Sequence, residues 1–136
     1  MMFKNKGFKI GNILYLTPRD AFAICNEDAI MLDVREDFMI GYKKFAVKEV
    51  LYCSASTIKY YYQNLPDNIP LVIADATSLH SKETANFLFE KGFTNISVLA
   101  GGLVEWDRDG LPLQSNTSEM LTGSCMCQLK QRGKNK

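Results

Sequence analysis

The residues best placed to do chemistry lie in one stretch, where Asp75 and His80 stand between an apolar run and an amphipathic run. Residues 71–74 are all apolar and predict a buried strand. Residues 81–91 predict a helix with Ser81 as its N-cap. A loop that enters a helix presents backbone N–H groups and the positive end of the helix dipole. We therefore expect an anion-binding loop made of Asp75, Ala76, Thr77, Ser78, Leu79, His80 and Ser81.

A second candidate is the pair Cys125 and Cys127 near the C-terminus. Two thiols so close can form a strained disulfide, bind a soft metal such as Cu(I), or carry and resolve a persulfide. The other interpretation is two exposed thiols without a function, and the sequence leaves both open. A structural zinc site would need four ligands, and Cys25 and Cys53 are expected to lie in a helix and at a strand end. We predict no metal site and no cofactor.

The elements that position these residues alternate along the chain. Apolar runs predict five strands, at residues 13–16, 29–32, 47–52, 71–74 and 95–99. Helical patterns predict four helices, which follow the first, third, fourth and fifth of these strands; the first begins at Pro18, and the others cover residues 54–65, 81–91 and 103–109. This alternation predicts a single α/β domain with a central, mainly parallel, five-stranded sheet and helices on both faces. Asp33, Asp75 and Gly101 follow strands, so they should share the carboxyl edge of that sheet.

The chain has 136 residues and a formal net charge of +1. The four basic residues Lys130, Arg132, Lys134 and Lys136 leave 12 basic and 15 acidic residues elsewhere. A solvated basic tail is the expected interpretation, and a nucleic-acid partner is not expected. No apolar run approaches a membrane span, and the N-terminus has no apolar signal-peptide core, so we expect a cytoplasmic protein that does not contact a membrane. The expected divisions are a lead-in at residues 1–12, a domain at 13–113 and a flexible tail at 114–136.

Three stretches together resemble the rhodanese-like sulfurtransferase domains. Leu32-Asp33-Val34-Arg35-Glu36 resembles the family's "DVR" signature, and 101–106 with 110–112 resembles its closing "GG…W…G-P" signature. The segment 71–91 stands where the family has its active-site loop. In active members, as the resemblance implies, this loop opens with a cysteine that carries sulfane sulfur as a persulfide. The thiolate is the nucleophile, and loop N–H groups stabilise its charge.

The chain departs from that pattern at the centre of the loop. The resemblance places Asp75 at the nucleophile position, His80 where a basic residue is common, and Ser78 where the family has a glycine. It also suggests that Asp33 and Arg35 either line the pocket or brace the loop, and we favour bracing. A carboxylate cannot carry sulfane sulfur, but it can accept the N–H groups that would hold a persulfide. We therefore expect Asp75 to act as an internal anion that holds the loop and repels thiosulfate.

These features lead to three alternative hypotheses for the function. The first is a rhodanese-like domain without ordinary thiosulfate sulfurtransferase activity, which acts as a binding or regulatory module for an unknown protein or a small anionic or thiol ligand. The second is a sulfur, persulfide or redox carrier that works through Cys125 and Cys127. The third is phosphoryl transfer with Asp75 as nucleophile and His80 as acid or base. Whether any catalysis remains is left open, and the usual site is expected to be inactive.

Overall fold

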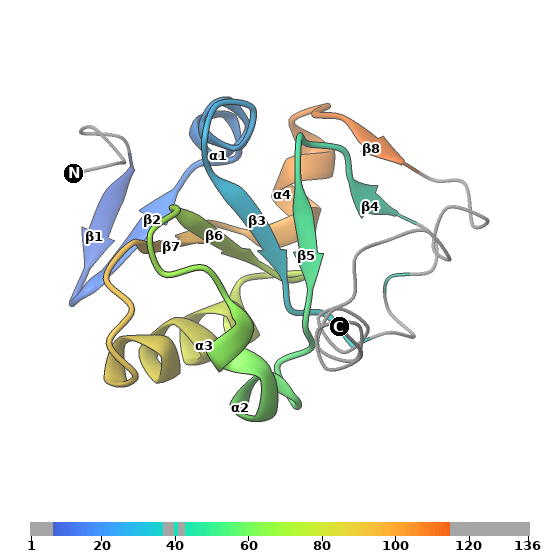
Figure 1. Cartoon of the computed structure of the whole chain (residues 1–136). Helices are drawn as coiled ribbons and strands as arrows, with labels where there is room; N and C mark the ends of the chain where they lie inside the picture. The colour runs from blue at the N-terminus through green and yellow to red at the C-terminus, as the bar shows by residue number, and fades with distance from the viewer. Residues whose placement is uncertain (1–6, 37–39, 41–42, 115–136) are drawn as a thin grey trace.

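A six-stranded sheet forms the centre of the computed structural model, which describes residues 7–36, 40 and 43–114 (Figure 1). Its spatial order is β1-β2-β7-β6-β3-β5, so β6 lies between β7 and β3. All neighbours pair in parallel except β1 and β2, which are antiparallel. The strands are β1 (Phe8–Ile10), β2 (Ile13–Leu16), β3 (Ile30–Asp33), β5 (Val50–Tyr52), β6 (Leu71–Ala74) and β7 (Ile96–Leu99).

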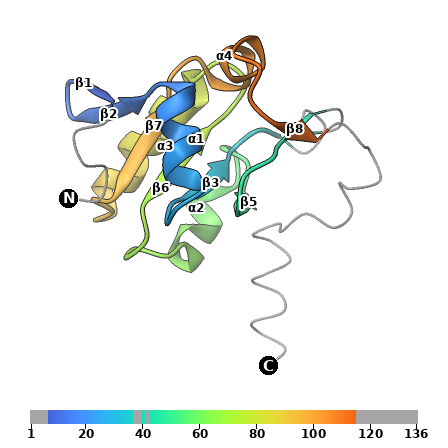
Figure 2. The same cartoon turned by 90° about the horizontal axis from the view of Figure 1, so that it is seen from above.

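Helices cover both faces of the sheet, as the alternating sequence pattern predicts. The helices α1 (Pro18–Cys25) and α4 (Gly102–Arg108) pack on one face, and α2 (Ile58–Tyr61) and α3 (Leu79–Glu90) pack on the other. Figure 1 shows α1 above the strands and α3 below them, and Figure 2 looks onto the sheet from the side of α1. None of the helices in the described ranges is long and apolar enough to cross a membrane.

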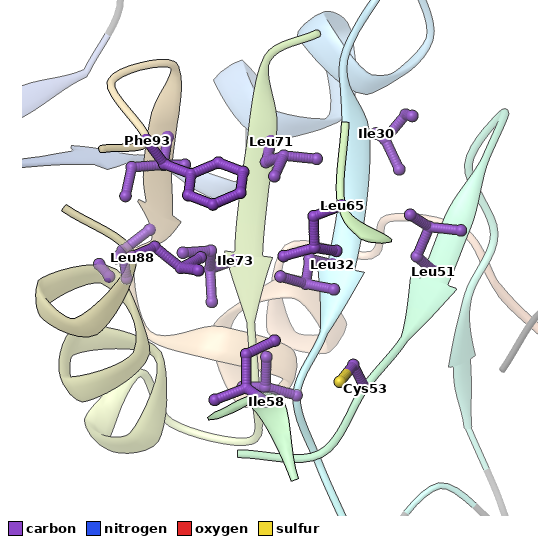
Figure 3. Close-up of a cluster of buried hydrophobic side chains, with 14 of the residues drawn as sticks. Ile30, Leu32, Leu51, Cys53, Ile58, Leu65, Leu71, Ile73, Leu88 and Phe93 are labelled. Atoms are coloured by element: carbon purple, nitrogen blue, oxygen red, sulfur yellow. The ribbon is translucent and has the colours of Figure 1, made fainter. Parts of the chain in front are cut away.

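The core consists of two layers because neighbouring strand residues point to opposite faces. In β6, Leu71 and Ile73 join the layer beneath α2 and α3, whereas Val72 and Ala74 join the layer beneath α1 and α4. Figure 3 shows the first layer, where Leu88 of α3 lies beside Ile73. A strand that is buried on both faces has no polar position, which explains the unalternating run in the sequence.

The second layer centres on Trp106, which is fully buried. Its indole ring makes edge contacts with Phe22 at 5.8 Å and Phe45 at 5.1 Å between ring centroids. Its Nε1 donates to the carbonyl of Pro112 at 2.9 Å. A two-stranded sheet of β4 (Lys44–Phe45) and β8 (Leu113–Gln114) closes the chain over this layer. The tryptophan therefore anchors α4 and the segment that follows it.

The sheet has one strand more than the five that were predicted. Strand β1 lies within the expected lead-in and pairs with β2 through a turn at Gly11 and Asn12, where Gly11 has φ +62°. Gly-Asn between two short apolar segments is a hairpin signal, but a three-residue strand carries too little pattern to stand out. The division of the chain at residues 12 and 113 stays a prediction.

The helix predicted at residues 54–65 is shorter than expected. Helix α2 spans Ile58–Tyr61, and a 3₁₀ helix at Tyr62–Asn64 follows it. The Oγ atoms of Ser54 and Thr57 lie 2.9 Å apart, and Thr57 Oγ1 also donates to the Ser54 carbonyl at 3.3 Å. Hydroxyls that bond locally in this way compete with helical hydrogen bonds, so the segment before Ile58 is a turn.

Candidate functional site

Asp75 follows β6 directly, and its carboxylate is enclosed by the segment that comes after it. Oδ1 accepts hydrogen bonds from the backbone N–H of Ser78 at 2.6 Å and from Ser81 Oγ at 2.8 Å. Oδ2 accepts one from the backbone N–H of His80 at 2.9 Å. The residue is only 2% exposed. The donors that a strand-to-helix loop would offer to an anion are therefore bonded to a side chain of the loop itself.

Helix α3 begins at Leu79, so the predicted N-cap at Ser81 is wrong. His80 and Ser81 belong to the first turn of the helix, and only residues 75–78 form the loop. The reason is the Asp75 carboxylate, which caps the free N–H of His80 from five residues upstream and interacts favourably with the helix dipole. Ser81 is fully buried, and its hydroxyl is one of the Asp75 donors. Ser81 was predicted to be part of the loop and to cap the helix, whereas it lies in the first turn of α3 and donates to Asp75.

Ser78 adopts a backbone conformation that side chains disfavour. Its φ is +88°, the only positive φ at a non-glycine residue in the described ranges. This turn lets the chain fold back so that the N–H of Ser78 reaches Asp75. The family resemblance places a glycine at this position, and glycine adopts a positive φ without strain. A serine at residue 78 therefore indicates backbone strain there.

The start of α4 holds the loop from the opposite side. The N–H of Leu103 donates to the Asp75 carbonyl at 2.8 Å, and the N–H of Val104 donates to the Ala76 carbonyl at 3.1 Å. Gly102 makes this approach possible, because a Cβ there would lie 2.5 Å from the Asp75 carbonyl oxygen and from the Ala76 carbonyl carbon. Gly102 therefore positions the loop. The Gly101-Gly102 pair drew attention to this residue in the sequence, but its contact with residues 75–76 was not predicted.

Asp33 and Arg35 form a buried ion pair at the end of β3. Arg35 Nη2 lies 2.7 Å from Asp33 Oδ2, and Arg35 Nε donates to Asp33 Oδ1 at 3.0 Å. Arg35 Nη2 also donates to the Lys43 carbonyl at 2.9 Å, and its guanidinium lies over the Phe45 ring. Burial raises the pKa of the Asp33 carboxyl, while the hydrogen bonds and charge of Arg35 act in the opposite direction. The pair ties β3 to the start of β4.

A cavity of about 130 Å³ opens beside the Asp75 loop, and Arg35 and His80 contribute to its lining. Arg35 lines this cavity, and its bonds to Asp33 and to the Lys43 carbonyl join β3 to β4. That Arg35 braces the Asp75 loop stays a prediction. The His80 side chain is 59% exposed, and its Nδ1 lies 3.8 Å from Glu83 Oε1. Three further residues line the cavity and were not predicted as part of the site: Val34, Glu36 and Ala55.

The cysteines do not enter this cavity in the described part of the chain. Cys25 and Cys53 are both buried free thiols, and burial raises the pKa of Cys25 to about 12. A thiol with such a pKa stays protonated at neutral pH and is a poor nucleophile. Cys125 and Cys127 lie outside the described residues. Among the described residues, no three His, Cys, Asp or Glu side chains gather as a metal site would require.

The parallel α/β fold with its loop between β6 and α3 is shared with a known family of domains. Residues 18–109 match the sequence model of the family described as the Rhodanese-like domain, so the chain belongs to the rhodanese-like domain family.

Curated relatives support this membership over most of the domain. Thiosulfate sulfurtransferase GlpE of Haemophilus influenzae is 23% identical over 100 residues, which cover 74% of this chain and 93% of that protein. The protein of the same name from Actinobacillus succinogenes is 26% identical over 101 residues, with 74% and 89% covered. These names describe the relatives, and the activity of this chain needs its own argument.

Solved structures show the same fold. A rhodanese-related protein from Thermoplasma volcanium superposes with a TM-score of 0.67 at 22% identity and covers 74% of this chain and 96% of its own. The polysulfide-sulfur transferase homodimer from Wolinella succinogenes gives a TM-score of 0.68 at 25% identity, with 78% and 81% covered. The predicted α/β architecture with a mainly parallel sheet is therefore confirmed.

Proposed function

We propose that this protein is a rhodanese-like binding or regulatory module that does not transfer sulfur from thiosulfate at the Asp75 loop. The observation that carries the proposal is the enclosure of the Asp75 carboxylate by Ser78 N–H, His80 N–H and Ser81 Oγ. These three donors face the place where the family resemblance puts the nucleophilic cysteine. The carboxylate supplies the negative charge that this arrangement stabilises, so the loop is complete without a substrate.

The chemistry of the carboxylate excludes the sulfur-carrying step at this position. A persulfide forms when a thiolate sulfur attacks a sulfane sulfur and displaces sulfite, and Asp75 has no sulfur atom. The carboxylate also repels an approaching thiosulfate dianion, and no free N–H of Ser78 or His80 is left to bind it. The loop therefore lacks the reacting atom that sulfur transfer needs.

The test is a thiosulfate-to-cyanide sulfur transfer assay on the wild type, Asp75→Cys and Asp67→Cys. Asp67 is exposed in the turn before β6, so its cysteine variant controls for the mere addition of a thiol. We expect no turnover by the wild type or by Asp67→Cys, and measurable turnover by Asp75→Cys, whose thiolate would face the same donors. Turnover by the wild type that survives Cys125→Ser with Cys127→Ser would overturn the proposal.

The carrier hypothesis for Cys125 and Cys127 stays a prediction, because both residues lie outside the described ranges. The intact mass of the protein distinguishes the carrier from the binding module. The mass is measured after incubation with a persulfide donor, before and after reduction. An added sulfur that disappears in Cys125→Ser or Cys127→Ser supports the carrier. A mass that does not change supports the module alone.

A further inference from the structure

The cavity beside Asp75 combines acidic and apolar walls. It measures about 130 Å³ and is lined by Val34, Arg35, Glu36, Ala55, Asp75 and His80. The chain brings these residues together because Val34 N–H donates to the Ala74 carbonyl at 2.8 Å and Ala55 N–H donates to the Val34 carbonyl at 2.9 Å. The ends of β6 and β3 and the segment after β5 are thereby joined around one space.

The charges of this lining favour a cation. The Arg35 guanidinium is held against Asp33 at 2.7 Å, so this pair is neutral as a unit. Asp75 and Glu36 then leave a formal charge of −2 on the wall. The Glu36 carboxylate accepts a hydrogen bond from a neutral hydroxyl, Ser56 Oγ, at 3.1 Å. An anion in this space would meet two carboxylates, with the loop N–H groups of Ser78 and His80 already bonded to Asp75.

The apolar part of the lining suits the stem of a long basic side chain. Val34 and Ala55 can contact methylene groups while a terminal ammonium or guanidinium reaches the carboxylates. A carboxylate has about four acceptor positions, and the three hydrogen bonds to Asp75 leave one of them for a further donor. The space is large enough for one side chain and too small for a folded element.

Exposed apolar residues flank the loop on both sides. Leu79, which precedes His80, is 62% exposed, and Val104, whose N–H is bonded to the Ala76 carbonyl, is 48% exposed. Both belong to the five large hydrophobic residues that the described part of the chain leaves exposed. Because Leu79 is next to the lining residue His80, it offers a second point of contact to a segment bound in the charged cavity.

We propose that the cavity, together with the exposed Leu79 next to its lining residue His80, binds a protein segment that inserts a lysine or arginine side chain next to an apolar residue. The basic head pairs with Glu36 and Asp75, and the apolar neighbour covers Leu79. The inference rests on the proposed function, because it requires Asp75 to be a fixed charge and not a reacting group. The partner of the proposed binding module is then a segment with a basic and an apolar side chain next to each other.

The experiment is a titration of ¹⁵N-labelled full-length protein with acetyl-Leu-Arg-Leu-amide, followed by amide chemical shifts. Acetyl-Leu-Gln-Leu-amide and acetyl-Leu-Glu-Leu-amide are the matched probes. We expect saturable shifts at Glu36, Ala55 and residues 75–80 with the arginine peptide, weakened by added salt, and no saturation with the glutamate peptide. Equal binding of the three peptides, shifts confined to another surface, or no saturable shift at millimolar peptide would overturn the inference.

Two variants test the two parts of the surface, each with a control. Glu36→Gln should weaken binding about fivefold, whereas Glu90→Gln at the far end of α3 should not change it. Leu79→Ser should weaken binding, whereas Ile10→Ser, an equally exposed change on β1, should not. Glu36 and Leu79 are partly or largely exposed, so these variants should fold. Sulfur turnover that survives Cys125→Ser with Cys127→Ser would defeat the proposed function, whereas failure of the arginine peptide without such turnover defeats only this inference.

Discussion

At the scale of single residues, Asp75 converts an anion-binding turn into one that is satisfied internally. Three donors at 2.6 to 2.9 Å converge on its carboxylate, and the residue is almost wholly buried. A buried carboxylate with these partners stabilises the fold, while its removal leaves buried donors unpaired. The proposed function gives the same residue a second effect, on anion binding, and the two effects can be measured separately.

Asp75→Ala should lower the free energy of unfolding by about 2–3 kcal/mol, because it unpairs the N–H groups of Ser78 and His80 and removes the cap of α3. Urea denaturation of the full chain measures the change. Asp67→Ala in the exposed turn is the control, and it should stay within about 0.5 kcal/mol of the wild type. Equal effects of the two substitutions would show that the Asp75 contacts contribute nothing.

Ser78→Gly should raise the free energy of unfolding by about 0.5–1 kcal/mol, because glycine adopts a φ near +88° without steric strain. Ser56→Gly is the matched change at a residue without a positive φ, and it should lower stability slightly. Thermal unfolding compares the two. A destabilised Ser78→Gly would mean that the serine side chain makes a contribution larger than its backbone strain.

At the scale of elements, the Asp75 loop depends on α4 as much as on β6 and α3. The N–H groups of Leu103 and Val104 bond to the carbonyls of residues 75 and 76, and Gly102 leaves room for this approach. The short helix therefore fixes the loop from behind, while the Trp106 ring anchors that helix in the core. A change at the start of α4 should reach the site without touching the cavity lining.

Gly102→Ala should destabilise the protein by about 3 kcal/mol or more, because its Cβ would overlap backbone atoms of residues 75 and 76. Gly11→Ala is a close control, since Gly11 has the same φ of +62° but nothing within 4 Å of an added Cβ, so only the cost of the backbone conformation remains, about 1 kcal/mol. Denaturant midpoints of the two variants give the comparison. Similar midpoints would show that Gly102 does not position the loop.

Much of the element order follows from the sequence. Unalternating apolar runs placed β3 and β6, and residues 95–99 were predicted as a strand although Ser97 interrupts their apolar residues. The carboxyl edge shared by these parallel strands brings Asp33, Asp75 and Gly101 to one side of the sheet. The start of α3 was misplaced because the capping group lies upstream of the helix, in a side chain that local patterns assign to a loop. The contact of Gly102 with residues 75–76 joins segments far apart in sequence, and no local pattern encodes such a distance.

At the scale of the whole molecule, the buried thiol of Cys25 and the half-buried phenol of Tyr52 link stability to alkaline pH. Burial raises the pKa of Cys25 from 9.0 to about 12 and the pKa of Tyr52 from 10.0 to about 12. In both cases the folded state holds its proton to a higher pH than the unfolded state does. The folded state is therefore favoured fully below pH 9, and this preference is lost as the pH rises towards 12.

The free energy of unfolding should therefore fall between pH 9 and pH 12, and Cys25→Ala should make this fall shallower by up to one proton per molecule. Tyr52→Phe should remove a further part of the fall in the free energy of unfolding, the part above pH 10. Urea titrations at several pH values measure the slopes, which are independent of any constant loss of stability in the variants. Parallel slopes in the wild type and in Cys25→Ala would contradict the assignment.

We propose that Asp75 takes the place of a bound anion, and an anion titration followed by amide chemical shifts tests this claim. Thiosulfate or sulfate is added to ¹⁵N-labelled wild type and to Asp75→Ala. In the wild type the amides of Ser78 and His80 should not respond, because Asp75 already accepts their hydrogen bonds. In Asp75→Ala the same amides should shift and saturate. Saturable shifts of Ser78 and His80 in the wild type, at the concentrations that saturate the variant, would contradict the claim.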